Sequence, residues 1–126
     1  MHKPVNKKVV AVVSDLFFSA KINEAARRAG VTVEYVTDPK LVIEKARSRP
    51  MLMIFDLNFD AVDPLGLIGE LKADQDLKNI SLLGYIQHVQ GELKQKAHDT
   101  GCDMVMPRSA FSLNLPQILK RHAGTL

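Results

Sequence analysis

The sequence contains one cysteine, no tryptophan and no long apolar run. A single cysteine, Cys102, excludes an internal disulfide and any cysteine-rich zinc site. No apolar stretch approaches the roughly 18 residues that a membrane helix needs. The run Val9–Val13 follows a basic N-terminus but is too short for the apolar core of a signal peptide. These absences predict a soluble, cytoplasmic protein with no membrane partner.

Glycine is absent from the turn at residues 14–18, directly after the first apolar run. A phosphate-cradling loop and a dinucleotide-binding turn both need glycine at that place. Two phenylalanines in the same turn, Phe17 and Phe18, also argue against a flavin site. The first turn therefore does not predict a nucleotide-binding protein.

The sequence also lacks a strong excess of one charge sign. Lys and Arg number 17 and Asp and Glu number 14, which gives a net charge of +3. The basic residues include dispersed doublets at residues 7–8, 27–28 and 120–121. Helix ends and solvated faces carry such doublets more often than nucleic-acid-binding surfaces do, so we expect no direct nucleic-acid partner.

What the sequence does contain is an alternation of strand-length apolar runs with segments of helical periodicity. The length of 126 residues suits one domain, which we expect to span residues 1–126. The runs expected to form strands lie at residues 9–13, 31–36, 51–55, 80–86 and about 103–106. The first run has no polar alternation, so both of its faces should be buried under helices.

Each apolar run is followed by a segment in which apolar residues recur at helical spacing. The expected helices end at Gly30, run from 39 to about 48, begin at Asp63-Pro64, span about 91–100, and carry a stripe from Leu115 to His122. Two interior glycines, Gly66 and Gly69, weaken the third helix. Strands that alternate with helices imply a parallel sheet with right-handed crossovers. We therefore predict an α/β, flavodoxin-like, doubly wound five-stranded sheet of order 2-1-3-4-5 with five helices.

Two aspartates follow strands that should be neighbours in this sheet. Asp15 comes after the first strand and Asp56 after the third, so the two carboxylates should converge at the carboxyl edge. Oxygen ligands of this kind suit Mg²⁺, and a carboxylate beside such a cation can act as a nucleophile toward a phosphoryl group. The alternative is that each aspartate is a turn residue that caps the next segment.

At these residues the chain resembles the receiver domains of two-component response regulators, the chemotaxis-type (CheY-like) regulators included, over nearly its whole length. Asp56 matches the family's phosphoacceptor, and Ser14-Asp15 matches its acidic pair. Asn58 matches the position whose backbone carbonyl ligates the metal. The segment Gly101-Cys102-Asp103 resembles the family's Gly-Ala-Asp before the fifth strand. The resemblance thus implies Mg²⁺ as a cofactor, held by Asp15, Asp56 and Asn58.

Three departures from the family's pattern indicate a divergent member with a degenerate phosphorylation site. Ser14 replaces one of the two metal-binding acids. The family's Thr or Ser at the end of the fourth strand falls at Ile86, or at Gln87 if the register slips. The family's phosphate-contacting Lys corresponds to Arg108, which keeps the positive charge on a planar, forked group.

The resemblance implies a function in phosphorelay signal transduction through protein–protein interaction, with a histidine kinase as a partner and Asp56 as the phosphorylated residue. It also implies a homodimer contact through the fourth helix, fifth strand and fifth helix. The alternative is a phosphate-independent pseudo-receiver. An enzyme that uses the two aspartates is the weakest interpretation, because no general base or lid is evident.

Several aromatic residues should lie close to the carboxyl edge of the sheet. The candidate rim consists of Phe17, Phe18, Phe59, His88 and Phe111. As an apolar rim around the acids, it would suit a partner or a small apolar ligand. The alternative, which the usual burial of large apolar residues favours, is that the phenylalanines belong to the core.

Overall fold

The computed structural model describes residues 7–87 and 91–124 of the chain. Five strands form one parallel sheet in the order β2-β1-β3-β4-β5. The strands are β1 (Lys8–Val12), β2 (Thr32–Tyr35), β3 (Leu52–Asp56), β4 (Leu82–Ile86) and β5 (Met104–Pro107). The predicted fold class and strand order are confirmed, and strand ends differ from the predicted ends by up to two residues.

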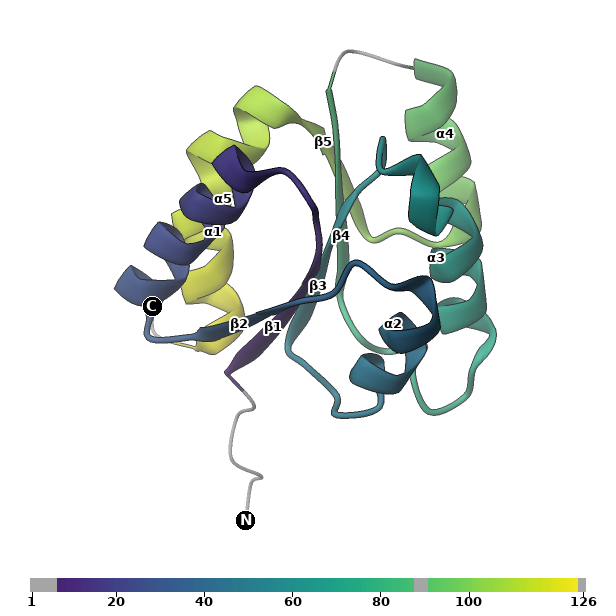
Figure 1. The fold of residues 1–126 in the computed structure, drawn as a ribbon, viewed down its shortest axis with the longest axis horizontal. Helices are drawn as coiled ribbons and strands as arrows, with labels where there is room; N and C mark the ends of the chain where they lie inside the picture. The colour runs from purple at the N-terminus through teal and green to yellow at the C-terminus, as the bar shows by residue number, and fades with distance from the viewer. Residues whose placement is uncertain (1–6, 88–90, 125–126) are drawn as a thin grey trace.

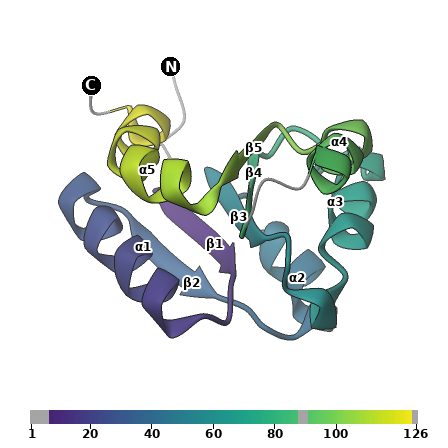
Figure 2. The same ribbon diagram turned by 90° about the horizontal axis from the view of Figure 1, so that it is seen from above.

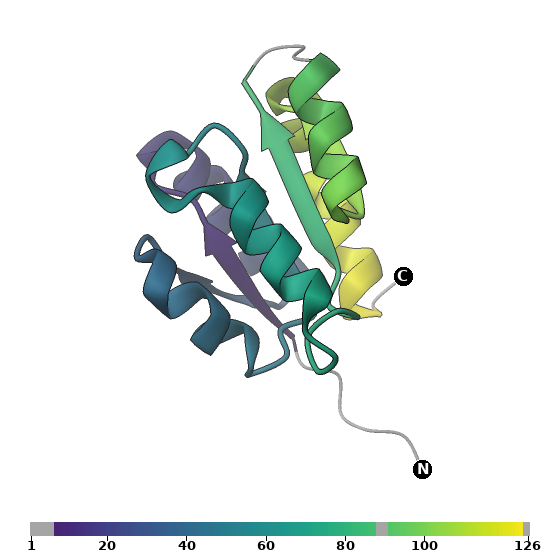
Figure 3. The same ribbon diagram turned by 90° about the vertical axis from the view of Figure 1, so that its right-hand side faces the viewer.

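In the described residues, five α-helices alternate with the strands. They are α1 (Leu16–Ala29), α2 (Pro39–Ala46), α3 (Pro64–Ala73), α4 (Gly91–Thr100) and α5 (Arg108–Ala123), with a short 3₁₀ helix, η1 (Asp60–Val62), before α3. Helices α1 and α5 cover one face of the sheet, and α2, α3 and α4 cover the other (Figures 1 and 2). Figure 3 views the molecule from the side of α2, α3 and α4. Among the described helices, none has the length and apolar character that crossing a bilayer requires.

The core consists of two apolar layers separated by the sheet. Side chains of alternate strand residues enter opposite layers, because successive Cβ atoms point to opposite faces. On β4, Leu83 and Tyr85 face α1 and α5, whereas Leu82 and Ile86 face the other helices. All five residues of β3 are buried, as expected of a central parallel strand.

Short polar residues and a glycine cap the helix ends. Asp38 accepts a hydrogen bond from the Lys40 amide at the start of α2, and Asp63 accepts one from the Gly66 amide at the start of α3. Gly30 closes α1 in the left-handed conformation with a φ of 71°. Because the strands are parallel, the carboxyl ends of β1, β3 and β4 lie at one edge of the sheet (Figure 1).

Candidate functional site

The site lies at the carboxyl edge of the sheet, where β1 and β3 are hydrogen-bonded neighbours. Asp56 is the last residue of β3, and Asp15 follows β1 at the start of α1. The structure therefore brings both predicted acids to this edge. Ser14, the residue in place of the second acid, is exposed.

The two carboxylate oxygens of Asp15 make different contacts. As the N-cap of α1, its Oδ1 accepts hydrogen bonds from the amides of Phe17 at 2.8 Å and Phe18 at 3.1 Å. Its Oδ2 accepts a hydrogen bond from Nη2 of Arg108 at 3.2 Å. Asp15 thus caps α1, as the capping alternative predicted, and its ion pair joins the first turns of α1 and α5.

Asp56 is nearly buried, with 8% of its surface exposed. Burial raises the pKa of its carboxyl group, because desolvation disfavours the charged form. The amide of Asn58, which donates to Oδ1 at 2.9 Å, acts in the opposite direction and lowers the pKa. The cation Arg108 also lowers it, and the charge of Asp15 raises it. Asp56 is therefore a carboxylate in a mostly apolar setting with one cation in reach.

Asn58 connects the ends of β3 and β4. Its side-chain Oδ1 accepts a hydrogen bond from the amide of Gln87 at 2.8 Å. Its backbone carbonyl accepts one from the amide of Asp60 at 3.0 Å. The sequence pointed only to the backbone carbonyl of Asn58, and the bridging role of the side chain was missed because it depends on the position of the neighbouring strand.

Arg108 begins α5, and its guanidinium group lies 4.5 Å from the centroid of the Phe18 ring. Stacking on the ring and pairing with Asp15 together fix the group above the acids. Ile86, at the end of β4, is buried in the layer beneath α2, α3 and α4. The last residue of β4 therefore offers no side-chain hydroxyl to the site.

Tyr85 is a residue of this region that the sequence analysis missed. It is fully buried, and its ring stacks against Phe18 and against Phe111 at centroid distances of 5.1 and 4.6 Å, in a cluster in which the two phenylalanine rings are 6.1 Å apart. Burial raises the pKa of its hydroxyl, and the charges of Asp56 and Asp15 raise it further. A polar tip on an otherwise apolar strand was the signal that could have drawn attention to it.

The predicted aromatic rim is wrong for two of its members. Phe18 and Phe111 belong to the core beneath α1 and α5, because each points from its helix toward the sheet. Phe59 is partly buried and packs on the opposite layer of the core. Phe17 alone of these phenylalanines is well exposed, at 64% against 4% for Phe18. His88 lies outside the residues that the structure describes.

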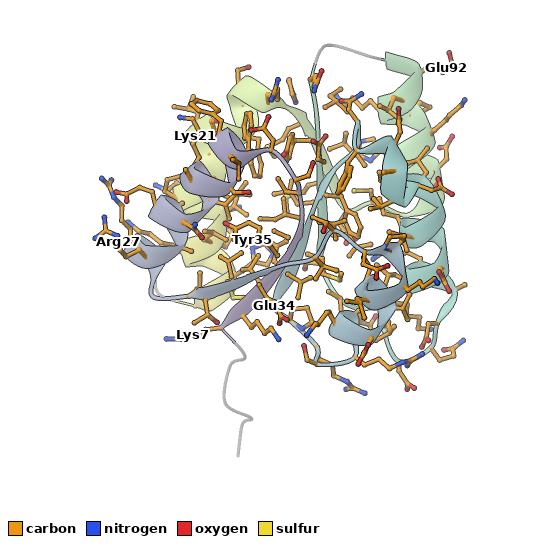
Figure 4. The ribbon with its side chains drawn as sticks, in the orientation of Figure 1. Lys7, Lys21, Arg27, Glu34, Tyr35 and Glu92 are labelled. Atoms are coloured by element: carbon orange, nitrogen blue, oxygen red, sulfur yellow. The ribbon has the colours of Figure 1, made fainter. Side chains whose placement is uncertain are left out.

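Phe17 instead lines a groove between α1 and α5. The groove has a volume of about 360 Å³, and Ala25, Leu115 and Pro116 also line it. The charged residues Lys21 and Arg28 contribute to its wall. Lys21 and the neighbouring Arg27 lie along α1 in Figure 4, on the outer side of the molecule. This groove is an apolar surface away from the core of the molecule.

The oxygen atoms at the edge match the ligand type that Mg²⁺ prefers. Asp15 and Asp56 each offer a carboxylate, and Asn58 offers a backbone carbonyl. In the part of the chain that the structure describes, no three His, Cys, Asp or Glu side chains gather where they could hold a metal ion, so the carbonyl would be a necessary ligand. Arg108 occupies one oxygen of Asp15 and would compete with a bound cation.

No family model and no curated protein matches the sequence. Solved structures do match it over almost its whole length. The phosphorylated cyanobacterial phytochrome response regulator RcpA is 25% identical, with a TM-score of 0.77 over 92% of this chain and 90% of its own. A response regulator from Hahella chejuensis is 14% identical, with a TM-score of 0.80 over 91% and 93%.

A third match carries a metal ion. The receiver domain of a sensor histidine kinase from Pseudomonas aeruginosa PAO1, with a magnesium ion coordinated in its active-site cleft, is 18% identical. Its TM-score is 0.77 over 93% of this chain and 97% of its own. The likeness to these three proteins is one of fold at low sequence identity.

Proposed function

Because the chain has the fold of response-regulator receiver domains, we propose that it is a signalling module rather than an enzyme. It acts through contacts with other proteins, and Asp56 is its phosphoacceptor. One observation carries this proposal: Asp56 ends the central strand at the carboxyl edge, beside an Asp15–Arg108 ion pair. A nucleophilic carboxylate and a cation that can balance phosphoryl charge thus lie at the same edge.

The proposed reaction is the transfer of a phosphoryl group to Asp56. A carboxylate oxygen forms a bond to phosphorus while the bond from phosphorus to the donor breaks, and the leaving group departs with the electron pair. The donor is a phosphohistidine of a histidine kinase or a small acyl phosphate. Arg108 offsets the negative charge that the aspartyl phosphate adds.

In this proposal Asp15, Asp56 and the Asn58 carbonyl would hold Mg²⁺, which would neutralise negative charge on the phosphoryl group. Asp15 and Arg108 are paired at 3.2 Å, with about a third of each side chain exposed. An ion pair this accessible to water contributes little to stability and can open. With only one acidic residue before α1, we expect weak binding of Mg²⁺.

A second candidate function is phosphate-independent binding of a partner. The exposed Phe17 ring and the groove between α1 and α5 favour it, as does the apolar Ile86 at the end of β4. A pseudo-receiver of this kind would bind through the groove in the same way whether Asp56 is phosphorylated or not.

The second surface that we propose for partners or for a homodimer consists of α4, β5 and α5.

The first test is intact-mass spectrometry of the full chain after incubation with Mg²⁺ and acetyl phosphate. The wild type is expected to gain the mass of one phosphoryl group, and Asp56→Asn is expected to gain none. Asp63→Asn is the matched control, because Asp63 is an exposed aspartate that caps α3 and is not among the residues proposed to hold Mg²⁺ or the phosphoryl group. Asparagine is a comparable N-cap, so this variant should be labelled like the wild type.

Labelling of Asp56→Asn to the level of the wild type would contradict the assignment of Asp56. An absence of labelling in the wild type, together with no heat of Mg²⁺ binding in a calorimetric titration, would contradict the phosphorelay proposal. The phosphate-independent function would then be the better account, and a pull-down that Phe17→Asp abolishes would support it.

A further inference from the structure

Two buried polar atoms at the site have no hydrogen-bond partner within the described part of the chain. They are the hydroxyl of Tyr85 and Nε of Arg108. Most buried polar groups in folded proteins are paired, because an unpaired donor loses its bond to water without replacement. Two unpaired donors in one region therefore need a common explanation.

Tyr85 is held close to Asp56 by the sheet. The two residues are partners in the register of β3 with β4. Tyr85 faces the layer of α1 and α5, and its ring packs against the rings of Phe18 and Phe111. The charges of Asp56, Asp15 and Arg108 all act on the pKa of its hydroxyl, so that hydroxyl lies within electrostatic reach of the site.

Two contacts hold the guanidinium group of Arg108 in place. Its guanidinium group stacks on Phe18, and Nη2 binds Asp15, while Nε makes no bond. Even a hydrogen bond from Nε to the oxygen of Tyr85 would leave one donor unpaired. The hydroxyl proton of Tyr85 would still lack an acceptor, because a phenol both donates and accepts. The pair therefore retains at least one donor to offer.

We propose that Tyr85 and Arg108 form a binding site for the phosphoryl oxygens of a group carried by Asp56, with the Tyr85 hydroxyl and Arg108 Nε as donors. This inference rests on the proposed phosphorylation of Asp56. The ligand is a tetrahedral oxyanion that is covalently bound. A free anion would be repelled by both carboxylates, whereas phosphorylation uses the Asp56 carboxylate in the new bond.

The hydroxyl of Tyr85 would belong to the face of the sheet opposite to the one that Ile86 occupies. Ile86 faces α2, α3 and α4 and has no polar atom to offer. Tyr85, one residue earlier, faces the layer of α1 and α5 and carries a hydroxyl. During transfer from acetyl phosphate, the bond from Asp56 to phosphorus forms and acetate leaves with the electron pair. Donors that meet the oxygens of the transferring group should accelerate this step.

The test compares two hydroxyl deletions in the full chain, Tyr85→Phe and Tyr35→Phe. Tyr35 is the other tyrosine of the chain and lies on β2 (Figure 4), where its hydroxyl contacts the Ser19 carbonyl and Asn23 Oδ1 at 2.8 Å each. The rate of phosphoryl gain is followed by intact-mass spectrometry with Mg²⁺ and acetyl phosphate. We expect Tyr85→Phe to lower the rate about tenfold or more. Tyr35→Phe should leave the rate unchanged.

Thermal unfolding separates this role from a structural one. Tyr85→Phe should have the Tm of the wild type or a higher one, because it removes an unpaired buried hydroxyl. Tyr35→Phe should have a lower Tm, because it removes a paired hydroxyl. A slow rate together with a lowered Tm for Tyr85→Phe would indicate damage to the fold and would overturn the inference.

Different results would overturn the role of Tyr85 and the phosphorylation of Asp56. If the wild type gains a phosphoryl group and Tyr85→Phe gains it at the same rate, the role of Tyr85 is overturned and Asp56 remains the acceptor. If the wild type gains none, the proposed phosphorylation is overturned and this inference falls with it.

Discussion

At the scale of single residues, the two acids of the site differ in their exposure to solvent. Asp56 is nearly buried, whereas the side chain of Asp15 is about one-third exposed. Burial raises the pKa of Asp56 above the ordinary value of an aspartate. Its ionised form is therefore disfavoured by folding, and the nucleophile of the proposed reaction reduces the stability of the protein.

Asp56→Asn should consequently raise the free energy of unfolding at pH 7. A raised folded-state pKa gives stability that is fully present below the unfolded value of about 4 and is lost as the pH rises through the folded value. The gain of the variant over the wild type should therefore be largest at neutral pH. It should shrink as the pH falls toward about 4. Urea unfolding at several pH values measures it.

The asparagine side chain can still accept the hydrogen bond from the Asn58 amide, so local geometry is preserved. An Asp56→Asn variant that is no more stable than the wild type at pH 7 would mean that other groups compensate the buried charge. Arg108, which lowers the pKa of Asp56, would be the first to examine.

At the scale of secondary-structure elements, the first turn of α1 carries both structure and site. Asp15 caps the helix through Oδ1 and binds Arg108 through Oδ2. Helix α5 begins at Arg108, so the two helices that cover one face of the sheet are tied at their N-termini. A change at Asp15 therefore affects the helix, the ion pair and the charge of the site together.

Two substitutions separate these effects. Asp15→Ala removes the cap and should lower the free energy of unfolding by about 1 kcal/mol. Asp15→Asn keeps a good capping residue and loses only a partly exposed ion pair, so its cost should be about 0.5 kcal/mol or less. Urea unfolding gives both values. Equal losses in the two variants would show that the ion pair, and not the cap, stabilises this turn.

Helix α3 illustrates how an element can form against its intrinsic preference. Gly66 and Gly69 weaken it in isolation. At Gly66, however, a Cβ atom would lie 2.3 Å from a carboxylate oxygen of Asp63, the residue that caps the helix. The glycine thus leaves room for the cap, and burial of Ile68 and Leu71 supplies the remaining stability.

At the scale of the whole molecule, the layer beneath α1 and α5 joins the site to the outer surface. Phe18, Tyr85 and Phe111 form a compact aromatic cluster there, and Phe17 packs edge-on against Phe18 from outside. The cluster links the region of Asp56 to the groove between the two helices. A partner bound in that groove would contact the helices that also carry Asp15 and Arg108.

Because Phe17 is exposed and Phe111 is buried, their substitutions should change the free energy of unfolding by different amounts. Phe17→Asp should change the free energy of unfolding by about 0.5 kcal/mol or less, because the ring is mostly exposed. Phe111→Ala should cost about 3–5 kcal/mol, because it opens a cavity within the aromatic cluster. Urea unfolding of both variants measures these values. A large loss of stability in Phe17→Asp would contradict the assignment of Phe17 to the surface.

The sequence by itself determined the fold class, the strand order and the residues at the strand ends. The alternation of apolar runs with helical periodicity is a local pattern, and a parallel sheet of five such units has few arrangements. Capping residues such as Asp38 and Asp63 act within one turn of their helices, so they too could be predicted. Cys102 is buried, as the sequence suggested, and burial raises the pKa of its thiol to about 11.

Only the tertiary structure decided which side chains of the site are buried and which of them contact one another. Phe17 and Phe18 are adjacent and chemically identical, and only the orientation of α1 against the sheet buries one of them. Asn58 meets Gln87, and Arg108 meets Asp15, across segments far apart in the chain. Tyr85 lies beside Asp56 because β4 pairs with β3 in one register. Such contacts depend on packing between distant elements, which no local pattern of residues encodes.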